Sequence, residues 1–320
     1  MWFRAIFSPR NKAHPATASS GLANLVLSAP AIRQLDRLRL SAGRYLPGYA
    51  VGLRPSLRRK PAAEFQQHRM YVPGDDVRFV DWKASARAEH IFVKQGEQPK
   101  EATVYLLLDC SASMAWGSPP KSQAALQLAL ALAYLALSHG DRFMLVPFTS
   151  KIGQPLGPLS GKGQLPTMVN ALRALKFSGK TDLLQTTREF NRRFAQSGGL
   201  TLIISDLLGS ESAEHLAAAL GYTPAPTWET VVLHLLHQEE LTPSLHGDYE
   251  MEDAETGQLA NYDIDMEALQ SYQQRLQGWF KSLELVCNQS NTFYTQISSA
   301  WALDSQVIPH LRSVNIVRPL

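Results

Sequence analysis

The stretch YLLLDCSASMAW, from Tyr105 to Trp116, decides the fold and raises the question of function. Its apolar run stops at Asp109, and Ser111 and Ser113 follow at alternate positions. A continuous apolar run of this length is typical of a strand buried on both faces of a parallel sheet. A carboxylate and two hydroxyls at the end of such a strand indicate a metal site, a nucleophile or a turn.

Strand and helix patterns alternate along the chain from Thr103 onward. The pattern predicts strands over residues 103–109, 142–148, 200–206 and 230–237, and helices over 122–140, 164–177, 181–196 and 211–222. Repeated alternation of this kind predicts an α/β fold with a doubly wound, mostly parallel sheet that has helices on both faces.

Three regions of the chain differ in their patterns. Residues 1–40 are predicted to form an N-terminal segment with a short amphipathic helix near its end. Residues 41–100 have short alternating runs broken by Gly and Pro, which predict a small β-rich subdomain. Residues 101–320 hold the α/β domain and a C-terminal extension, in which residues 238–265 are acidic and are interpreted as a solvated stretch without chemistry.

Composition and length narrow the class of protein. The 320 residues are 45% hydrophobic and 18% charged, as expected of a folded globular chain. The longest apolar run, Ala124 to Leu137, has about 14 residues, and a membrane span needs roughly 20. The sequence shows no well-made signal peptide, and its two cysteines form no disulfide or zinc pattern. We therefore expect a cytoplasmic protein without a membrane span.

Charge is distributed unevenly along the chain. Residues 1–100 hold 17 Lys and Arg against 7 Asp and Glu, a balance of +10, whereas residues 101–320 hold 14 against 21, a balance of −7. A basic region can bind nucleic acid, anionic lipid or an acidic protein, or it can be ordinary solvated surface. Without aromatic residues interleaved along a basic groove, nucleic-acid binding has little specific support.

The candidate site consists of oxygen donors at the carboxyl ends of the strands, where open α/β sheets bind ligands. Asp109 and Asp206 each end a predicted strand, and Thr181 precedes a helix that starts at the same edge. Together with Ser111 and Ser113 they form a set that suits a hard cation such as Mg²⁺, with Mn²⁺ and Ca²⁺ as alternatives. Two carboxylates balance the divalent charge, and one coordination position stays open for a carboxylate from a partner.

Serine catalysis fits the same stretch less well. The nucleophile elbow of α/β-hydrolases reads G-x-S-x-G, whereas Ser111 is flanked by Cys110 and Ala112, with Asp109 and Ser113 at the glycine positions. The nearest candidate base, His139, belongs to the far end of the following helix. His234 and His237 lie three apart in a strand pattern, so they point to opposite faces and cannot share one ion.

A second set of residues lies in the predicted β-rich subdomain. Arginines recur every nine positions, and with a tryptophan they suit a partner-binding surface: Arg69, Arg78, Trp82 and Arg87. The alternative is internal salt bridging to nearby aspartates, namely Asp75, Asp76 and Asp81.

At the strand-end residues the sequence resembles a von Willebrand factor type A domain. The metal-ion-dependent adhesion site of that domain has the pattern D-x-S-x-S, a loop Thr and a strand-end Asp, which Asp109, Ser111, Ser113, Thr181 and Asp206 match in order. The resemblance implies a non-enzymatic metal-dependent protein-binding module. In it Asp206 acts on the metal mainly through water, and an Asp or Glu of the partner completes the coordination.

The segment from Glu64 to Glu97 resembles the region that precedes the type A domain in a bacterial family known as domain of unknown function 58. Together with the type A core and the DAETG motif at Asp253–Gly257, this likeness covers roughly residues 40–318; Gly96 departs from it, standing where the family tends to have an aromatic residue. The resemblance implies an adaptor that works with a MoxR-type AAA+ ATPase in chaperone-like assembly or activation of a client. The alternatives are a metal-dependent hydrolase using the same cation and salt-sensitive binding of nucleic acid or lipid by the basic region.

Overall fold

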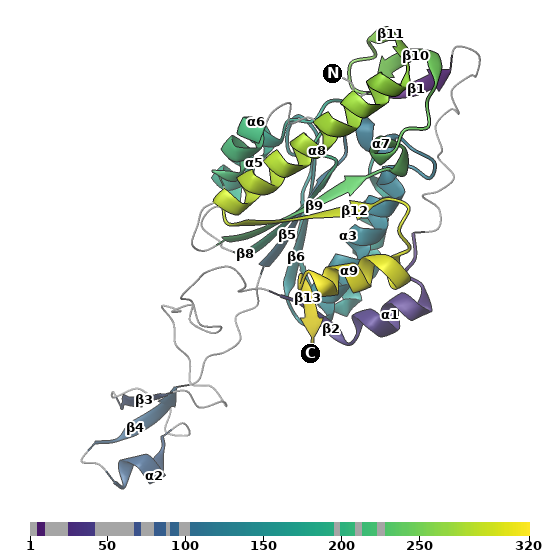
Figure 1. Cartoon of the computed structure of the whole chain (residues 1–320). Coiled ribbons are helices and arrows are strands. Elements are labelled where there is room, and N and C mark those ends of the chain that lie inside the picture. The colour runs from purple at the N-terminus through teal and green to yellow at the C-terminus, as the bar shows by residue number, and fades with distance from the viewer. Residues whose placement is uncertain are drawn as a thin grey trace. The chain divides into compact units, whose positions relative to one another are not determined.

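The computed structural model describes residues 5–9, 25–41, 67–71, 80–87, 90–95, 103–194, 199–208, 213–222 and 228–320. The chain forms two compact units, one made of Met1–Tyr45 with Ala102–Leu320 and the other of Leu46–Glu101. The described α-helices, labelled in Figure 1 where there is room, are α1 (Ala29–Leu35), α2 (Trp82–Ser85), α3 (Lys121–Ser138), α4 (Leu165–Ala174), α5 (Leu183–Phe194), α6 (Ala213–Leu220), α7 (Gln238–Leu241), α8 (Met266–Gln289) and α9 (Ile308–Ser313). The described strands are β1 (Ala5–Pro9), β2 (Leu38–Leu40), β3 (Gln67–Met70), β4 (Phe92–Gln95), β5 (Thr103–Asp109), β6 (Arg142–Phe148), β7 (Leu156–Ser160), β8 (Gly199–Ser205), β9 (Trp228–Leu236), β10 (Gly247–Asp253), β11 (Leu259–Ile264), β12 (Thr292–Ser298) and β13 (Val317–Pro319).

A six-stranded sheet forms the centre of the larger unit. Its strand order is β12-β9-β8-β5-β6-β7, and all neighbours pair in parallel except β7, which runs antiparallel to β6 at the edge. Strands β5 and β8, which carry the predicted site residues at their ends, are neighbours in the middle of the sheet. The predicted α/β fold with a mostly parallel sheet is confirmed.

Strand β5 shows why its sequence is apolar from Val104 to Leu108. Leu106 and Leu108 pack into one hydrophobic cluster together with α3 and α4, whereas Tyr105 and Leu107 pack into a second cluster with α5, α6 and α8. Because successive side chains of a strand point to opposite faces, a strand covered by helices on both sides needs apolar residues at every position. Figure 1 shows α8, α5 and α6 on one side of the sheet and α3 and α9 on the other.

Helix α3 is the central helix of its layer and is buried on nearly every side. Its Ala and Leu residues combine high helix propensity with an apolar surface all round, which is the pattern of an interior helix. It ends at His139, and Gly140 follows with φ of 79°. This left-handed conformation is the usual helix stop and favours glycine.

The N-terminal region contains a short helix near its end, where one was predicted within residues 1–40. Its described part belongs to the larger unit: α1 begins at the cap Ser28, and β2 pairs antiparallel with β13, so that Leu40 lies opposite Val317. The helix lies earlier than the apolar spacing of Ile32–Leu40 predicts, because the chain leaves the helix after Leu35 and forms β2. Long-range strand pairing therefore replaces the local helical pattern there.

The smaller unit contains β3 and β4, which pair antiparallel, and the short helix α2. Asp81 caps α2 by accepting hydrogen bonds from the backbone N–H groups of Lys83 and Ala84, both at 3.0 Å. An N-cap aspartate satisfies donors that the first helical turn leaves open.

The acidic region between residues 238 and 265 is structured. It forms α7 and the antiparallel strands β10 and β11, and β10 also pairs with β1. The interpretation of this region as a solvated stretch without chemistry was wrong, because it supplies Glu240 to a buried ion-pair network.

Candidate metal centre

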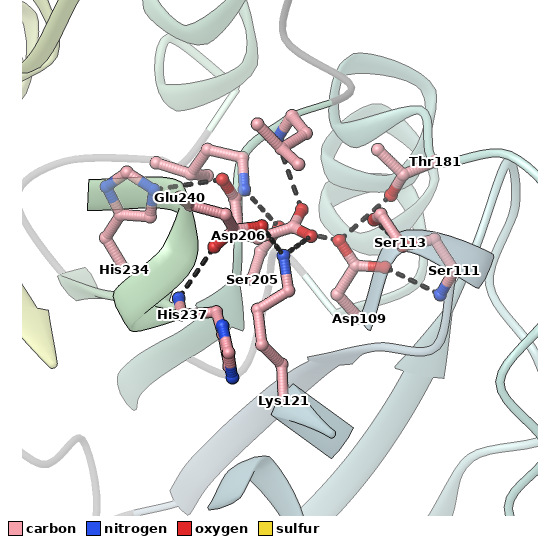
Figure 2. A network of polar contacts seen from close by, with 12 residues as sticks. Asp109, Ser111, Ser113, Lys121, Thr181, Ser205, Asp206, His234, His237 and Glu240 are labelled. Carbon is pink, nitrogen blue, oxygen red and sulfur yellow. Dashed lines mark hydrogen bonds and ion pairs between the residues drawn. The ribbon is translucent and has the colours of Figure 1, made fainter. Parts of the chain in front are cut away.

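Two buried aspartates stand at the carboxyl edge of the sheet, as the strand positions predicted. Asp109 is the last residue of β5 and Asp206 follows β8, and neither has any exposed surface. Because β5 and β8 pair in parallel, with Leu108 opposite Ile204, their ends meet at one edge. Figure 2 shows both carboxylates within one polar network.

Asp109 is surrounded by neutral donors. Its Oδ1 accepts a hydrogen bond from the backbone N–H of Ser111 at 2.9 Å, and its Oδ2 accepts from Thr181 Oγ1 at 3.1 Å and Ser205 Oγ at 2.6 Å. Among the residues that the structure describes, no Lys, Arg or His forms an ion pair with it. Desolvation, together with the charge of Asp206, raises the pKa of Asp109 to about 6.

The two serines lie beside each other because of the turn after β5. Ser111 has an extended backbone and precedes a 3-10 helix over Ala112–Ala115, which brings Ser113 Oγ to 3.0 Å from Ser111 Oγ. Backbone hydrogen bonds from Ala112 N to Gly179 O and from Ser178 N to Cys110 O fix this turn to the loop that carries Thr181. The five residues predicted from sequence are thus brought to one site (Figure 2).

Lys121, which the sequence analysis did not single out, also enters this site. It is the first residue of α3, and its ammonium group is fully buried. The ammonium forms an ion pair with Asp206 Oδ2 at 2.7 Å and another with Glu240 Oε1 of α7. Desolvation alone would lower the pKa of Lys121, but the charges of Asp206 and Glu240 outweigh it and raise the pKa.

The ion pair with Lys121 shifts the pKa of Asp206 in the direction opposite to the shift of Asp109. Although burial favours the neutral acid, the Lys121 charge and hydrogen bonds from Lys121 and Ser113 hold the pKa of Asp206 below its usual value. The backbone N–H of Leu208 also donates to Asp206 Oδ1 at 3.2 Å. Leu207, between them, adopts a left-handed conformation with φ of 55°, which is uncommon for a side chain other than glycine.

Helix α7 is fixed next to the site through a capping box. The backbone N–H of His237 donates to Glu240 Oε2 at 2.6 Å, and Tyr272 Oη of α8 donates to the Glu240 carbonyl at 2.6 Å. The His237 ring packs edge-on to Trp116 and close to Gly117, where a Cβ atom would lie 2.6 Å from the ring. Only a residue without a side chain fits Gly117, whose φ is 105°.

The remaining polar candidates have structural roles. His234 is fully buried, with Nε2 2.9 Å from the Asp206 carbonyl and Nδ1 2.7 Å from Tyr294 Oη. Its burial lowers the pKa of the imidazole to about 3, so it stays neutral. His139 contacts the Leu38 carbonyl, and burial raises the pKa of the Cys110 thiol to about 12, which leaves no thiolate at neutral pH.

The spacing of the oxygen atoms suits a six-coordinate cation. Ligands at about 2.05 Å from Mg²⁺ in an octahedron lie about 2.9 Å from their neighbours. The hydrogen-bonded pairs Ser111 Oγ to Ser113 Oγ, at 3.0 Å, and Thr181 Oγ1 to Asp109 Oδ2, at 3.1 Å, are compatible with this spacing, which is close to that of an ordinary hydrogen bond. The described residues contain no group of three or more His, Cys, Asp and Glu placed to hold a metal ion, so a metal here would depend on hydroxyl ligands.

Sequence signals for the residues that were missed can be named in retrospect. A lysine in the first turn of a helix opposes the helix dipole, so Lys121 at the start of α3 implies compensating carboxylates. Ser205 is a polar residue at the end of a mostly apolar strand and next to Asp206. Glu240 lies three residues after His237, the spacing of a capping box.

Two of the predicted partner-binding residues can be placed in the smaller unit. Trp82 begins α2 with 66% of its surface exposed, and Arg87 is also exposed. Arg69 contributes backbone to β3, but its side chain lies outside the described residues, as do Arg78, Asp75, Asp76 and Gly96. The partner-binding surface stays a prediction.

The family of the chain follows from a comparison with family models. The model described as "Protein of unknown function DUF58" matches residues 67–277, about two thirds of the chain. The chain belongs to the DUF58 family. This match includes the β5 and β8 ends with the five predicted site residues, and it confirms the resemblance to the DUF58 family; the metal-site motif at the strand ends stays a prediction.

Known relatives of this DUF58 protein include the uncharacterized protein Rv1480 of Mycobacterium tuberculosis and Mb1516 of Mycobacterium bovis. Each is 27% identical over 257 residues, which cover 79% of this chain and 78% of the relative. Among solved structures, the hypothetical protein BatB from Bacteroides thetaiotaomicron is similar with a TM-score of 0.40 and 13% identity, over 67% of this chain and 98% of that one. A von Willebrand factor type A structure from Catenulispora acidiphila gives a TM-score of 0.42 and 13% identity, over 69% and 43% of the two chains.

In the described ranges of the DUF58 protein, no helix is both long enough and apolar enough to cross a bilayer.

Proposed function

We propose that this DUF58 protein is a non-enzymatic, metal-dependent protein-binding adaptor whose site takes Mg²⁺. The observation that carries the proposal is the environment of Asp109, a fully buried carboxylate that has hydroxyl and amide donors but no cationic partner among the described residues. A buried ionised carboxylate without a compensating charge is costly, and a bound cation removes that cost. Asp109, Ser111, Ser113 and Thr181 would hold the metal, directly or through water.

The charge of the site supports a divalent cation. The three carboxylates of Asp109, Asp206 and Glu240 and the single ammonium of Lys121 leave a net charge of −2 when all are ionised. A divalent ion neutralises this charge, whereas a monovalent ion leaves half of it. In this proposal Asp206 stays bound to Lys121 and reaches the metal through water.

The proposed ligand of the metal's open position is an Asp or Glu side chain of a partner. Mg²⁺ prefers oxygen ligands, and among protein side chains it is usually held by carboxylates. The DUF58 resemblance adds a MoxR-type AAA+ ATPase or its client as the expected partner, and a chaperone-like role in assembling or activating that client.

A metal-dependent hydrolase at the same site has less support. Such an enzyme needs a general base within hydrogen-bond reach of a metal-bound water. His234 uses both ring nitrogens in buried contacts, and Glu240 is held by Lys121 and the start of α7. Because these contacts already occupy the His234 ring and the Glu240 carboxylate, neither side chain is well placed to act as a general base. We therefore propose that the protein binds a partner at this site and is not an enzyme.

The proposal is tested by metal-dependent association. The full chain is immobilised and a purified MoxR-type ATPase from the same genome is passed over it in Mg²⁺ or in EDTA. We expect association only with Mg²⁺, and its loss in Asp109→Ala. Asp36→Ala, an aspartate at an exposed ion pair, serves as the matched control and retains association. Association that is unchanged in EDTA would contradict the metal dependence.

A further inference from the structure

The most unusual side chain in the site is Lys121. It is the one charged residue among the largest side chains of the described part that have less than 2% of their surface exposed, and its helix position places it against the positive end of the α3 dipole. Both burial and the dipole disfavour an ammonium group there. The two ion pairs with Asp206 and Glu240 are what compensate for these costs.

The ion pairs divide the site into two halves. In one half Lys121 neutralises Asp206 and Glu240, and in the other Asp109 has only neutral donors. Ser113 connects the halves, since its hydroxyl contacts both Ser111 and Asp206. A metal held by Asp109 and the serines therefore lies close to a carboxylate that is already bound to a cation of the chain itself.

We propose that Lys121 is a built-in cation that competes with the metal for Asp206, keeps this carboxylate from binding the metal directly, and so limits the metal affinity of the site. The inference rests on the proposed function, since it concerns the same metal. It assigns Lys121 a tuning role. Because Lys121 holds Asp206, the chain supplies only the Asp109 carboxylate directly to the metal, so the site binds the metal moderately and keeps one coordination position open for the partner's carboxylate.

The net charge of the buried cluster sets the expected size of the change in metal affinity. The buried cluster carries −2 in the natural protein, −3 in Lys121→Met, −1 in Glu240→Gln and −2 again in the double variant. Unit charges a few ångströms from a divalent ion change its binding by at least about tenfold, even with effective protein screening. Lys121→Met also frees Asp206 to bind the metal, whereas Glu240→Gln leaves Lys121 bound to Asp206 alone.

The experiment measures Mn²⁺ binding to the full-length protein by titration calorimetry and by the electron paramagnetic resonance of free Mn²⁺. Relative to the natural protein, we expect Lys121→Met to bind at least about tenfold more tightly and Glu240→Gln about tenfold more weakly. The double variant has the natural net charge but a freed Asp206, so we expect it to bind at least as tightly as the natural protein and at least about tenfold more tightly than Glu240→Gln. Lys162→Met is the control, because Lys162 is exposed and contacts Tyr134 of α3, about 20 Å along the helix from Lys121. It is expected to leave the affinity unchanged.

The outcomes separate this inference from the proposed function. If the natural protein binds Mn²⁺ and Lys121→Met binds it equally or more weakly, the inference fails and the metal site stands. If neither the natural protein nor any variant binds Mn²⁺, both fail. If Lys121→Met does not fold, the double variant decides: a folded protein that binds Mn²⁺ at least as tightly as the natural protein supports the competition for Asp206, and an affinity as low as that of Glu240→Gln overturns it.

Discussion

Asp109 and Asp206 occupy equivalent places in the fold, yet their surroundings differ. Each stands at the end of a central parallel strand and each is fully buried. Lys121 pairs with Asp206 and lowers its pKa, whereas desolvation, unopposed by an ion pair, raises the pKa of Asp109 to about 6. The difference shows that strand-end position gathers carboxylates, while their charge partners decide which of them has a compensating cation within the described chain.

The largest effect on stability is expected from Asp206→Asn. Removing one partner of a buried ion pair leaves the other charge uncompensated and typically costs about 3 kcal/mol. Here it weakens the pairing of Lys121, whose remaining partner is Glu240. Urea denaturation in EDTA should show this loss, and Asp109→Asn should lose less than about 1 kcal/mol under the same conditions because no ion pair is broken. Equal losses would remove the contrast between the two aspartates.

Ser205→Ala tests how Asp109 is positioned. Ser205 Oγ donates to Asp109 Oδ2 and accepts from the backbone N–H of Leu207 at 2.9 Å, so it orients the carboxylate without being a proposed metal ligand. Loss of such an orienting hydrogen bond typically weakens metal binding by about tenfold. Mn²⁺ titration measures this change. Ser138→Ala is the matched control, because the buried Ser138 hydroxyl has no hydrogen-bond partner among the described residues, and it should bind Mn²⁺ normally.

The metal-free protein should lose stability as the pH rises from 5 to 7, by about 1 kcal/mol from Asp109 alone. The folded pKa of Asp109, about 6, lies above the unfolded value, so its contribution to stability is fully present at low pH and decreases as the pH approaches 7. Asp206 has the opposite sign, and its contribution is lost only below the unfolded pKa of about 4. Denaturation in EDTA at both pH values, for the natural protein and Asp109→Asn, isolates the Asp109 part as their difference. A difference independent of pH would contradict this assignment.

The smallest effect is expected from Lys162→Met. Lys162 pairs with Asp36 at 3.2 Å, but the two side chains are 55% and 45% exposed, so solvent screens the pair. Its loss should change the free energy of unfolding by no more than about 0.5 kcal/mol. Thermal denaturation of this variant beside Lys121→Met compares an exposed lysine ion pair with a buried one in the same unit. A loss comparable to that of Lys121→Met would show that burial is not what separates them.

The sheet was predictable because its strands are buried on both faces. The apolar runs at 103–109 and 142–148 match β5 and β6, and those at 200–206 and 230–237 match β8 and β9 to within two residues. The edge strand β7 is not among the predicted strands, since Leu156–Ser160 contains Gly157 and Pro158 and faces solvent at several positions. A strand at an edge needs no apolar pattern, so sequence periodicity does not reveal it.

The site was predictable only where its residues follow strands. Asp109 and Asp206 are placed by the ends of β5 and β8, and the serines are placed by their distance from Asp109. Lys121 lies 85 residues from Asp206 and 119 from Glu240, and local patterns carry no information on which distant charges meet. The short helix α7 that presents Glu240 also lies in an acidic region whose composition is typical of solvated surface.

The pairing of β2 with β13 has a consequence for synthesis of the protein. Leu38 and Leu40 are buried beside a strand that is made only after the whole central sheet and the inserted unit of residues 46–101. The side chains of this early segment can pack on α3, which is made much sooner, but the backbone groups of β2 that pair with β13 must wait until residues 317–319 leave the ribosome. Unpaired strand edges of this kind are where growing chains aggregate. The order of synthesis thus makes the pairing of β2 with β13 one of the last steps in completing this part of the fold.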